Sequence, residues 1–453
     1  MTVTLVCHAD VLVTMDDERR EIADGALAWR DGAIAAMGTT AELAALADTA
    51  DEVIDAAGCV VTPGLVNTHH HLYQTLTRAV PGITSASLFE WLRRLYPIWA
   101  QFRPDDVFAA TQLGLAELAL SGCSLSSDHL YLFPNGVRID DTVAAAEVIG
   151  LRFHATRGAM SLGESAGGLP PDSLVEPEDA ILDDAIRLID AFHDPSEGAM
   201  VRIGIAPCSP FSVTPDLMRE AALLARDKGV MLHTHLAEDA DDVAFSLARF
   251  GCRPGQYAAE LGWTGPDVWL AHCVQLDAEE IALFAQTRTG VVHCPCSNCR
   301  LGSGIAPVRA MRAAGVPVGL GVDGSASSDS GNLLNEARQA MLLQRAVGGA
   351  SALDPREALY LATRGGAGIL GRSDCGMLAP GLRADLAIWD MNDIPSQGAW
   401  DRVAGLVLSP PRQVRDLFVE GAPVVLGGEL ARVERSDVLG AAERSLSRLL
   451  EAA

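Results

Sequence analysis

The chain has few of the features that mark nucleic-acid-binding proteins. Its 34 basic residues face 59 acidic ones, Lys228 is the only lysine, and the formal net charge is −25. An acidic surface of this kind disfavours contact with nucleic acids and with acidic membranes. We therefore expect neither among the partners, and a small-molecule substrate instead.

Long apolar runs are also missing. No stretch reaches the ~18 uncharged apolar residues that span a bilayer. The first twenty residues lack the basic and apolar regions of a signal peptide. Ten cysteines in 453 residues do not resemble a secreted disulfide framework. We expect a cytoplasmic protein with reduced cysteines, and its 49% hydrophobic residues suffice for a large core.

The apolar runs that are present predict an α/β protein with a (β/α)₈ TIM-like barrel. Short strand-like runs between Gly and Asp-Gly turns fill 1–60 and return in 368–435, which suggests one small β-sandwich built from both ends of the chain. In 61–367, eight strand-like runs alternate with helical ones, the number that closes a barrel. A doubly wound open sheet is the alternative. Residues 436–453 are expected to form a C-terminal helix.

Histidines gather where the barrel strands are predicted to end, which is the end at which barrel enzymes carry their active sites. These are His69, His70, His71, His233, His235 and His272. His69 and His71 are two residues apart, so on an extended segment both imidazoles project to one side and can bind one ion. His70 then points the other way. Imidazoles joined by a carboxylate suit zinc or iron.

The remaining members of the predicted site follow later strands. Either His233 or His235 could supply a third imidazole. We favour His235, because Glu238 follows it by three residues, where a general acid/base reaches the metal without filling its ligand sphere. His272, at the end of the sixth strand, could orient the attacking water or stabilise developing charge. Asp323, after the eighth strand, could bind the metal and accept a proton from that water.

The segments PGLVNTHHHL, HTHLAE, AHC and GVDG, in this order, resemble the amidohydrolase superfamily, in particular its cytosine/guanine deaminase and triazine hydrolase branch. The resemblance covers essentially the whole chain. It implies four ligands to one divalent metal: His69, His71, His235 and Asp323. It also implies Glu238 as the proton shuttle and His272 beside the attacking water. Zinc is the expected metal and iron the alternative. A metal pair bridged by a carboxylated lysine is not expected, because the fourth-strand segment VRIGIAPCS has no lysine.

Gln74 and Cys208 carry the prediction of the substrate. The Gln74 amide can donate to one ring heteroatom and accept from another, which suits an amidine edge such as that of guanine. A capping or solvent-facing glutamine is the alternative. Guanine deaminases have an arginine where this chain has Cys208, which argues against plain guanine. The segments NTHHHLYQTLTRAVPG and LFEWLRRLYPIWA most resemble those of the 8-oxoguanine deaminases.

The resemblance to the 8-oxoguanine deaminases implies an aminohydrolase that converts 8-oxoguanine and water to urate and ammonia by attack at C2. Isocytosine, which has the same amidine edge, is a second candidate substrate, and guanine is a weaker one because of Cys208. The presence of both Glu238 and His272 favours an amine over a halide as leaving group, because only the amine must be protonated. Two alternatives stay open: an N-ethylaminohydrolase of hydroxytriazines, and a catalytically idle metal scaffold that binds purines. The family resemblance also suggests a homo-oligomer.

Segment 293–299 (HCPCSNC) has the look of a zinc knuckle. Pro295 stiffens it, and the family has a similar stretch without a second zinc. We therefore do not expect a structural zinc at Cys294, Cys296 and Cys299. Asp128 and His129, at the end of the second barrel strand, are candidates for contacts with the metal ligands. Tyr73, Trp91 and Trp99 could line the pocket, although aromatic residues in helices more often belong to the core.

Overall fold

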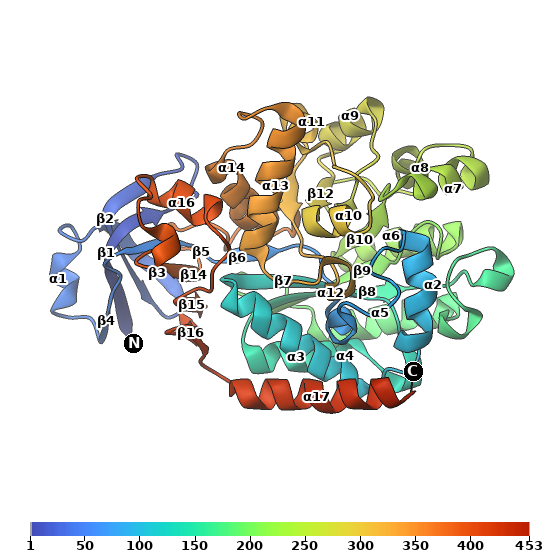
Figure 1. Cartoon of the computed structure of the whole chain (residues 1–453), viewed down its shortest axis with the longest axis horizontal. Coiled ribbons are helices and arrows are strands. Elements are labelled where there is room, and N and C mark those ends of the chain that lie inside the picture. Colours follow the sequence, from blue (N-terminus) through green and yellow to red (C-terminus); the bar gives the residue numbers. More distant parts are fainter. Residues whose placement is uncertain (1, 453) are drawn as a thin grey trace.

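The computed structural model describes residues 2–452 and contains a barrel and a smaller β-sheet (Figure 1). The barrel strands are all parallel and follow one another in chain order. They are β6 (Leu65–Asn67), β7 (Cys123–Leu130), β8 (Arg152–Ala159), β9 (Val201–Pro207), β10 (Met231–Leu236), β11 (Val268–His272), β12 (Gly290–His293) and β13 (Val318–Leu320).

The first and last strands of this sheet meet. The Thr68 amide donates to the Leu320 carbonyl at 3.0 Å, and the Asp323 amide donates to the His69 carbonyl at 3.1 Å. These bonds close the sheet, which excludes the doubly wound alternative and confirms the predicted (β/α)₈ barrel. They also bring His69 and Asp323 next to each other at the carboxyl rim.

Helices follow each barrel strand and cover the outside of the barrel (Figure 1). Helix α6 shows why they form where they do. The Thr214 hydroxyl caps its first turn by accepting the Leu217 amide at 3.1 Å, Pro215 opens it, and Gly229 ends it in the left-handed region (φ 68°). The helices named below are α2 (Leu88–Trp99), α3 (Pro104–Leu120), α6 (Pro215–Lys228) and α10 (Pro295–Arg300).

The smaller sheet draws its strands from both ends of the chain. Strands β1 (Val3–Val13), β2 (Glu21–Arg30), β3 (Ala33–Thr39), β4 (Glu52–Asp55) and β5 (Cys59–Pro63) come before the barrel, and β14 (Leu386–Asp390), β15 (Asp416–Val419), β16 (Ala422–Leu426) and β17 (Glu429–Leu430) come after it. The two sets join where β5 pairs antiparallel with β14. The predicted small domain built from both termini is therefore confirmed.

The chain closes with α17 (Arg435–Ala452), which lies along α3 on the outside of the barrel (Figure 1). Arg448 of α17 forms an ion pair with Asp106 of α3. Among the described residues, no helix combines the length and the apolarity needed to cross a membrane.

Candidate active site

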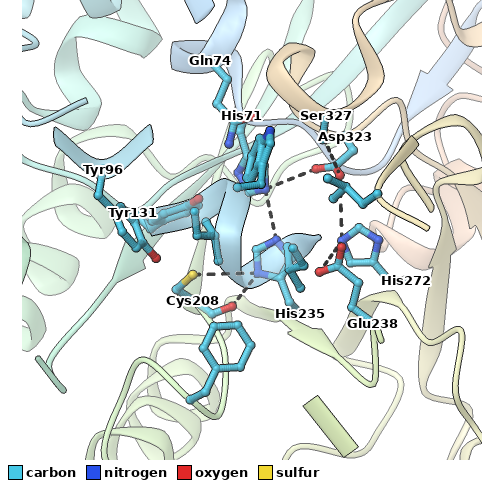
Figure 2. A pocket seen from close by; sticks show the side chains of 15 residues that line it. His71, Gln74, Tyr96, Tyr131, Cys208, His235, Glu238, His272, Asp323 and Ser327 are labelled. Atoms are coloured by element: carbon cyan, nitrogen blue, oxygen red, sulfur yellow. Dashed lines mark hydrogen bonds and ion pairs between the residues drawn. The ribbon is translucent and has the colours of Figure 1, made fainter. Parts of the chain in front are cut away.

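A pocket opens at the carboxyl ends of the barrel strands (Figure 2). Its polar lining comprises His71, Gln74, Tyr96, Tyr131, Cys208, His235, Glu238, His272, Asp323 and Ser327. Helix α2 contributes an apolar wall through Leu88, Trp91 and Leu92. Every predicted catalytic and substrate-binding residue thus lines this one pocket, and the predicted ligand His69 lies fully buried beside it.

The hydrogen bonds of the histidine rings determine which nitrogens carry protons. His69 and His71 lie just after β6 rather than within it. The His71 Nδ1–H donates to the carbonyl of His129 at 2.8 Å. His233 Nδ1 lies 2.8 Å from the Trp269 carbonyl, which can only accept, so His233 is protonated there and its Nε2 accepts from His69 Nδ1 at 2.8 Å. Both His69 and His71 are left with an Nε2 lone pair.

His235 follows the same pattern. Its Nδ1–H donates to the Cys208 carbonyl at 2.6 Å, which leaves a lone pair on Nε2, 3.0 Å from Nε2 of His71. Burial lowers the pKa of His235 to about 3, so the ring is neutral. His233, in contrast, uses both ring nitrogens in hydrogen bonds and offers neither to a metal. The geometry therefore supports His235 over His233 as the third imidazole.

These donors fit one divalent metal. Asp323 Oδ1 lies 3.3 Å from Nε2 of both His69 and His71. Ligands held ~2.1 Å from one ion in a tetrahedron lie roughly 3.4 Å apart. The buried His69 Nε2 has no hydrogen-bond partner among the described residues, and two unprotonated nitrogens at 3.0 Å repel each other unless a cation lies between them. A bound cation satisfies all of these groups.

Glu238 and His272 face each other at the edge of this cluster. His272 Nε2 lies 3.6 Å from Glu238 Oε2 and 4.0 Å from Asp323 Oδ2. Burial, and then the charge of Asp323, raise the pKa of Glu238 well above its ordinary value. The His272 Nδ1–H donates to Asn298 Oδ1 at 2.9 Å, which directs the Nε2 lone pair toward Glu238. Glu238 is therefore suited to take up and hold a proton more readily than an exposed carboxylate.

Two serines missed by the sequence analysis hold Asp323. Ser297 and Ser327 each donate to Oδ2, at 2.5 and 3.0 Å, while the Gly324 amide donates to Oδ1 at 2.7 Å. Ser297 and Asn298 both belong to α10, within the stretch that resembles a zinc knuckle. The segment HCPCSNC was therefore a signal for these two residues, although its cysteines suggested a different kind of site.

The cysteines of that stretch belong to no group of three metal-type donor atoms among the described residues. In residues 2–452, only two histidine-rich groups bring three or more metal-type donor atoms together, and neither contains a cysteine. Cys294 is buried, Cys299 is exposed, and the Cys296 sulfur accepts a hydrogen bond from Asn335 at 3.3 Å.

Backbone strain gathers around the same pocket. His272, Cys273, Asp323 and Ala237 adopt left-handed φ values of 70°, 50°, 61° and 50°, although none is a glycine. Such conformations cost free energy and persist where the surrounding structure requires them, which is common at functional sites.

Gln74 is buried and lines the pocket, which excludes a solvent-facing role. Its amide nitrogen lies 3.3 Å from the Tyr73 hydroxyl, whereas its Oε1 has no partner in the described chain. Cys208 and Gln74 lie on opposite sides of His71 and His235 (Figure 2), and the Cys208 sulfur is 3.9 Å from His235 Nδ1. Burial raises the pKa of the Cys208 thiol to about 12, so the thiol is neutral.

His129 lies closer to the metal ligands than its place in the sequence suggested. It belongs to one of the two donor groups, with His69, His71 and His235. Its Nε2–H donates to the Ala206 carbonyl at 2.9 Å, and its buried Nδ1 is left without a partner. Asp128 accepts the Leu72 amide at 2.8 Å and so anchors the turn that carries Gln74. Tyr131 and Tyr96 also line the pocket, and no motif had singled them out.

A comparison with protein families decides the classification. The model described as "Amidohydrolase family" matches residues 60–424. The chain belongs to the amidohydrolase family. This confirms the resemblance inferred from the histidine motifs.

Named relatives of this amidohydrolase include deaminases and aminohydrolases. It is 48% identical to the 8-oxoguanine deaminase of Pseudomonas aeruginosa, over 87% of this chain and 89% of the relative. It is 39% identical to the hydroxydechloroatrazine ethylaminohydrolase of Pseudomonas sp. strain ADP, over 88% of this chain and 85% of the relative. These matches place it among the hydrolases that cleave C–N bonds.

A solved structure agrees with the fold, and it contains zinc. The zinc complex of atrazine chlorohydrolase from Arthrobacter aurescens superimposes with a TM-score of 0.93 at 33% identity, covering 98% of this chain and all of the other. That neighbour binds zinc, and the histidine-rich cluster of this amidohydrolase is a site that can hold a metal.

Proposed function

We propose that this amidohydrolase deaminates 8-oxoguanine to urate and ammonia with one divalent metal per chain, for which zinc is the best candidate. One observation carries the proposal: the free Gln74 amide oxygen and the buried Glu238 line the same pocket as His71 and His235, whose Nε2 lone pairs are free, and the buried His69 lies directly beside them. The 48% identity to an 8-oxoguanine deaminase supports the choice of substrate.

His69, His71, His235 and Asp323 would hold the metal. When bound, the metal supplies a Lewis acid that lowers the pKa of water and so produces a nucleophile at neutral pH. Neutral imidazoles with one carboxylate are a donor set that zinc prefers, although iron also accepts it. Ser297 and Ser327 hold Asp323 in place for this task.

Glu238 would move the protons. It takes one from the attacking water as the C2–O bond forms and passes it to a ring nitrogen. It then takes the remaining proton from the new C2 hydroxyl and delivers it to the exocyclic nitrogen, as the C2=O bond forms, the C2–N bond breaks and ammonia leaves. The raised pKa of Glu238 suits a group that must both accept and release a proton. His272, with its proton fixed on Nδ1 by Asn298, offers the Nε2 lone pair to orient the water. That tautomer favours an orienting role for His272 over stabilisation of negative charge.

Gln74 would read the amidine edge of the substrate. Its free Oε1 can accept from a ring N–H or the exocyclic amine, and its second amide hydrogen can donate to a ring nitrogen or carbonyl. Cys208 contributes a neutral thiol at the position where guanine deaminases have an arginine. Such a pocket would accept an oxidised purine whose carbonyls are placed differently from those of guanine.

A second candidate function is the removal of ethylamine from hydroxytriazines. The apolar wall from Leu88, Trp91 and Leu92 supports it, because such a wall can contact an N-ethyl group. The 39% identity to a hydroxydechloroatrazine ethylaminohydrolase points the same way.

The first test supplies the zinc-loaded enzyme with 8-oxoguanine and measures ammonia and urate together. We expect both products in equal amounts. The matched reaction contains hydroxyatrazine, with ethylamine as the measured product. If ethylamine forms and urate does not, removal of ethylamine from hydroxytriazines replaces 8-oxoguanine deamination as the proposed function. If a sample with one zinc per chain forms neither urate nor ethylamine, both candidate functions are contradicted.

A further inference from the structure

The barrel has a second cavity at the end opposite to the active site. Its volume is about 370 Å³, and its lining comes from the amino ends of strands β8 to β11. His154, Arg202 and Met231 stand at or near the first residues of β8, β9 and β10, and Asp267 directly precedes β11. The proposed metal ligands, in contrast, lie at the carboxyl end of their strand or just beyond it. The two sites therefore share the barrel strands and no residues.

The cavity contains buried N–H groups without partners. The His154 side chain is 2% exposed, and neither of its ring nitrogens has a hydrogen-bond partner in the described chain. A neutral imidazole carries one N–H, so His154 has an unused donor here. Unpaired buried donors are uncommon in native structures and point to a partner other than the chain itself.

Two further donors face the same space. His193 Nδ1 accepts the Ile203 amide at 3.1 Å, so its proton is on Nε2 and available to a ligand. Arg202 uses its terminal nitrogens on main-chain carbonyls, one of them that of Gly371 at 3.0 Å. Its Nε–H is buried and has no acceptor within residues 2–452.

Arg202 also has no ion-pair partner among the described residues. No carboxylate in the described chain lies within 4 Å of it, whereas neighbouring Arg372 binds both oxygens of Asp374 at 2.8 Å. Asp267 is the one carboxylate in the lining, and it already accepts from Arg226 at 2.9 Å. The cavity is therefore rich in N–H donors, and the one carboxylate in its lining is already paired.

We propose that this cavity is an anion site that binds a phosphate-sized oxyanion through Arg202, His154 and His193. Such an anion accepts several N–H bonds at once and pairs with the half-buried Arg202 guanidinium, a charge-assisted contact that Arg and His donors favour. The ligand is a phosphate group, either free or at the end of a metabolite. Because it links β8, β9 and the loop before β9, its binding stabilises the barrel without touching the catalytic pocket.

The test measures thermal unfolding of the metal-loaded enzyme against inorganic phosphate, with sodium chloride at equal ionic strength as reference. We expect a saturable rise in melting temperature with phosphate. In Arg202→Gln, the apparent Kd rises at least about tenfold, since a charge-assisted hydrogen bond is lost. A parallel titration with glycerol 3-phosphate shows whether the site takes a free phosphate or a monoester.

Two variants serve as controls. Arg219→Gln removes an exposed arginine of α6 that pairs with Asp216 outside the cavity, and its response to phosphate should equal that of the wild type. His193→Gln tests the site independently if Arg202→Gln does not fold, and it should weaken phosphate binding as well. An equal phosphate response in the wild type, Arg202→Gln and His193→Gln would overturn the proposal, as would no response in the wild type. Turnover should be unchanged in Arg202→Gln.

Discussion

At the scale of single residues, three main-chain carbonyls determine the chemistry of the metal cluster. The carbonyls of His129, Cys208 and Trp269 accept hydrogen bonds from the Nδ1–H groups of His71, His235 and His233. His233 in turn accepts a hydrogen bond from the Nδ1–H of His69. Each carbonyl thereby leaves the other nitrogen of a ring free for a metal. Because these carbonyls belong to residues in or next to barrel strands, the fold determines which ring nitrogen carries the proton and so prepares the site for a cation.

Glu238→Gln should abolish turnover while the metal stays bound. Glutamine fills the same space but cannot move protons, and Glu238 is not among the proposed ligands. We expect kcat to fall by about 10²- to 10⁴-fold, the usual contribution of a general acid/base. Ammonia release and zinc content per chain are measured on the same sample. Activity close to the wild type would show that another group carries the proton.

Asn298 should matter as a positioning residue for His272. Leucine at 298 removes the acceptor for the His272 Nδ1–H, and we expect kcat to fall by about 10- to 100-fold with little change in KM or zinc content. Asn298→Asp keeps an acceptor oxygen and should restore most of the activity. Equal losses in Asn298→Leu and Asn298→Asp would show that packing, not the hydrogen bond, is what the enzyme needs.

At the scale of elements, sequence patterns located the strands and most of the polar residues that line the pocket, because a period of two and the end of a parallel strand have direct spatial consequences. They could not locate Ser297, Ser327 or Asn298, whose roles depend on how α10 and the turn after β13 face each other. Nor could they show that α2 supplies the apolar wall. Trp91 on this helix lines the pocket, while Trp99 on the same helix is fully buried in the core, and nothing in the local sequence separates the two.

The α10 segment offers a test at this scale. The double variant Cys296→Ala/Cys299→Ala should keep one metal per chain, since these sulfurs form no donor group with a third ligand. Metal content by atomic absorption and the rate of ammonia release should both match the wild type. A fall from two metals per chain to one would instead show a structural zinc in this segment.

At the scale of the whole molecule, the sequence predicted the two architectures but not the contact that joins them. Arg152 begins barrel strand β8 and is fully buried, and it donates to both carboxylate oxygens of Asp385, at 2.6 and 2.9 Å. Asp385 directly precedes β14 of the smaller sheet. These residues are 233 positions apart, and no periodicity or motif links them. Because both charges are buried, each needs the other as its counter-charge.

Breaking this pair should destabilise the whole chain. In Arg152→Met, the Asp385 carboxylate keeps the Glu420 amide as a donor at 2.8 Å but loses its buried counter-charge. We expect the free energy of unfolding to fall by about 3–5 kcal/mol. Arg152→Met/Asp385→Asn removes the unpaired charge and keeps an acceptor for Glu420, so it should recover a large part of this loss. Urea unfolding followed by circular dichroism compares the variants.

If the losses of the two single changes simply add in the double variant, the two charges are not coupled across the junction. If instead the coupling is present while ammonia release per folded molecule stays constant, the ion pair stabilises the joint between barrel and sheet and takes no part in the chemistry at the opposite rim.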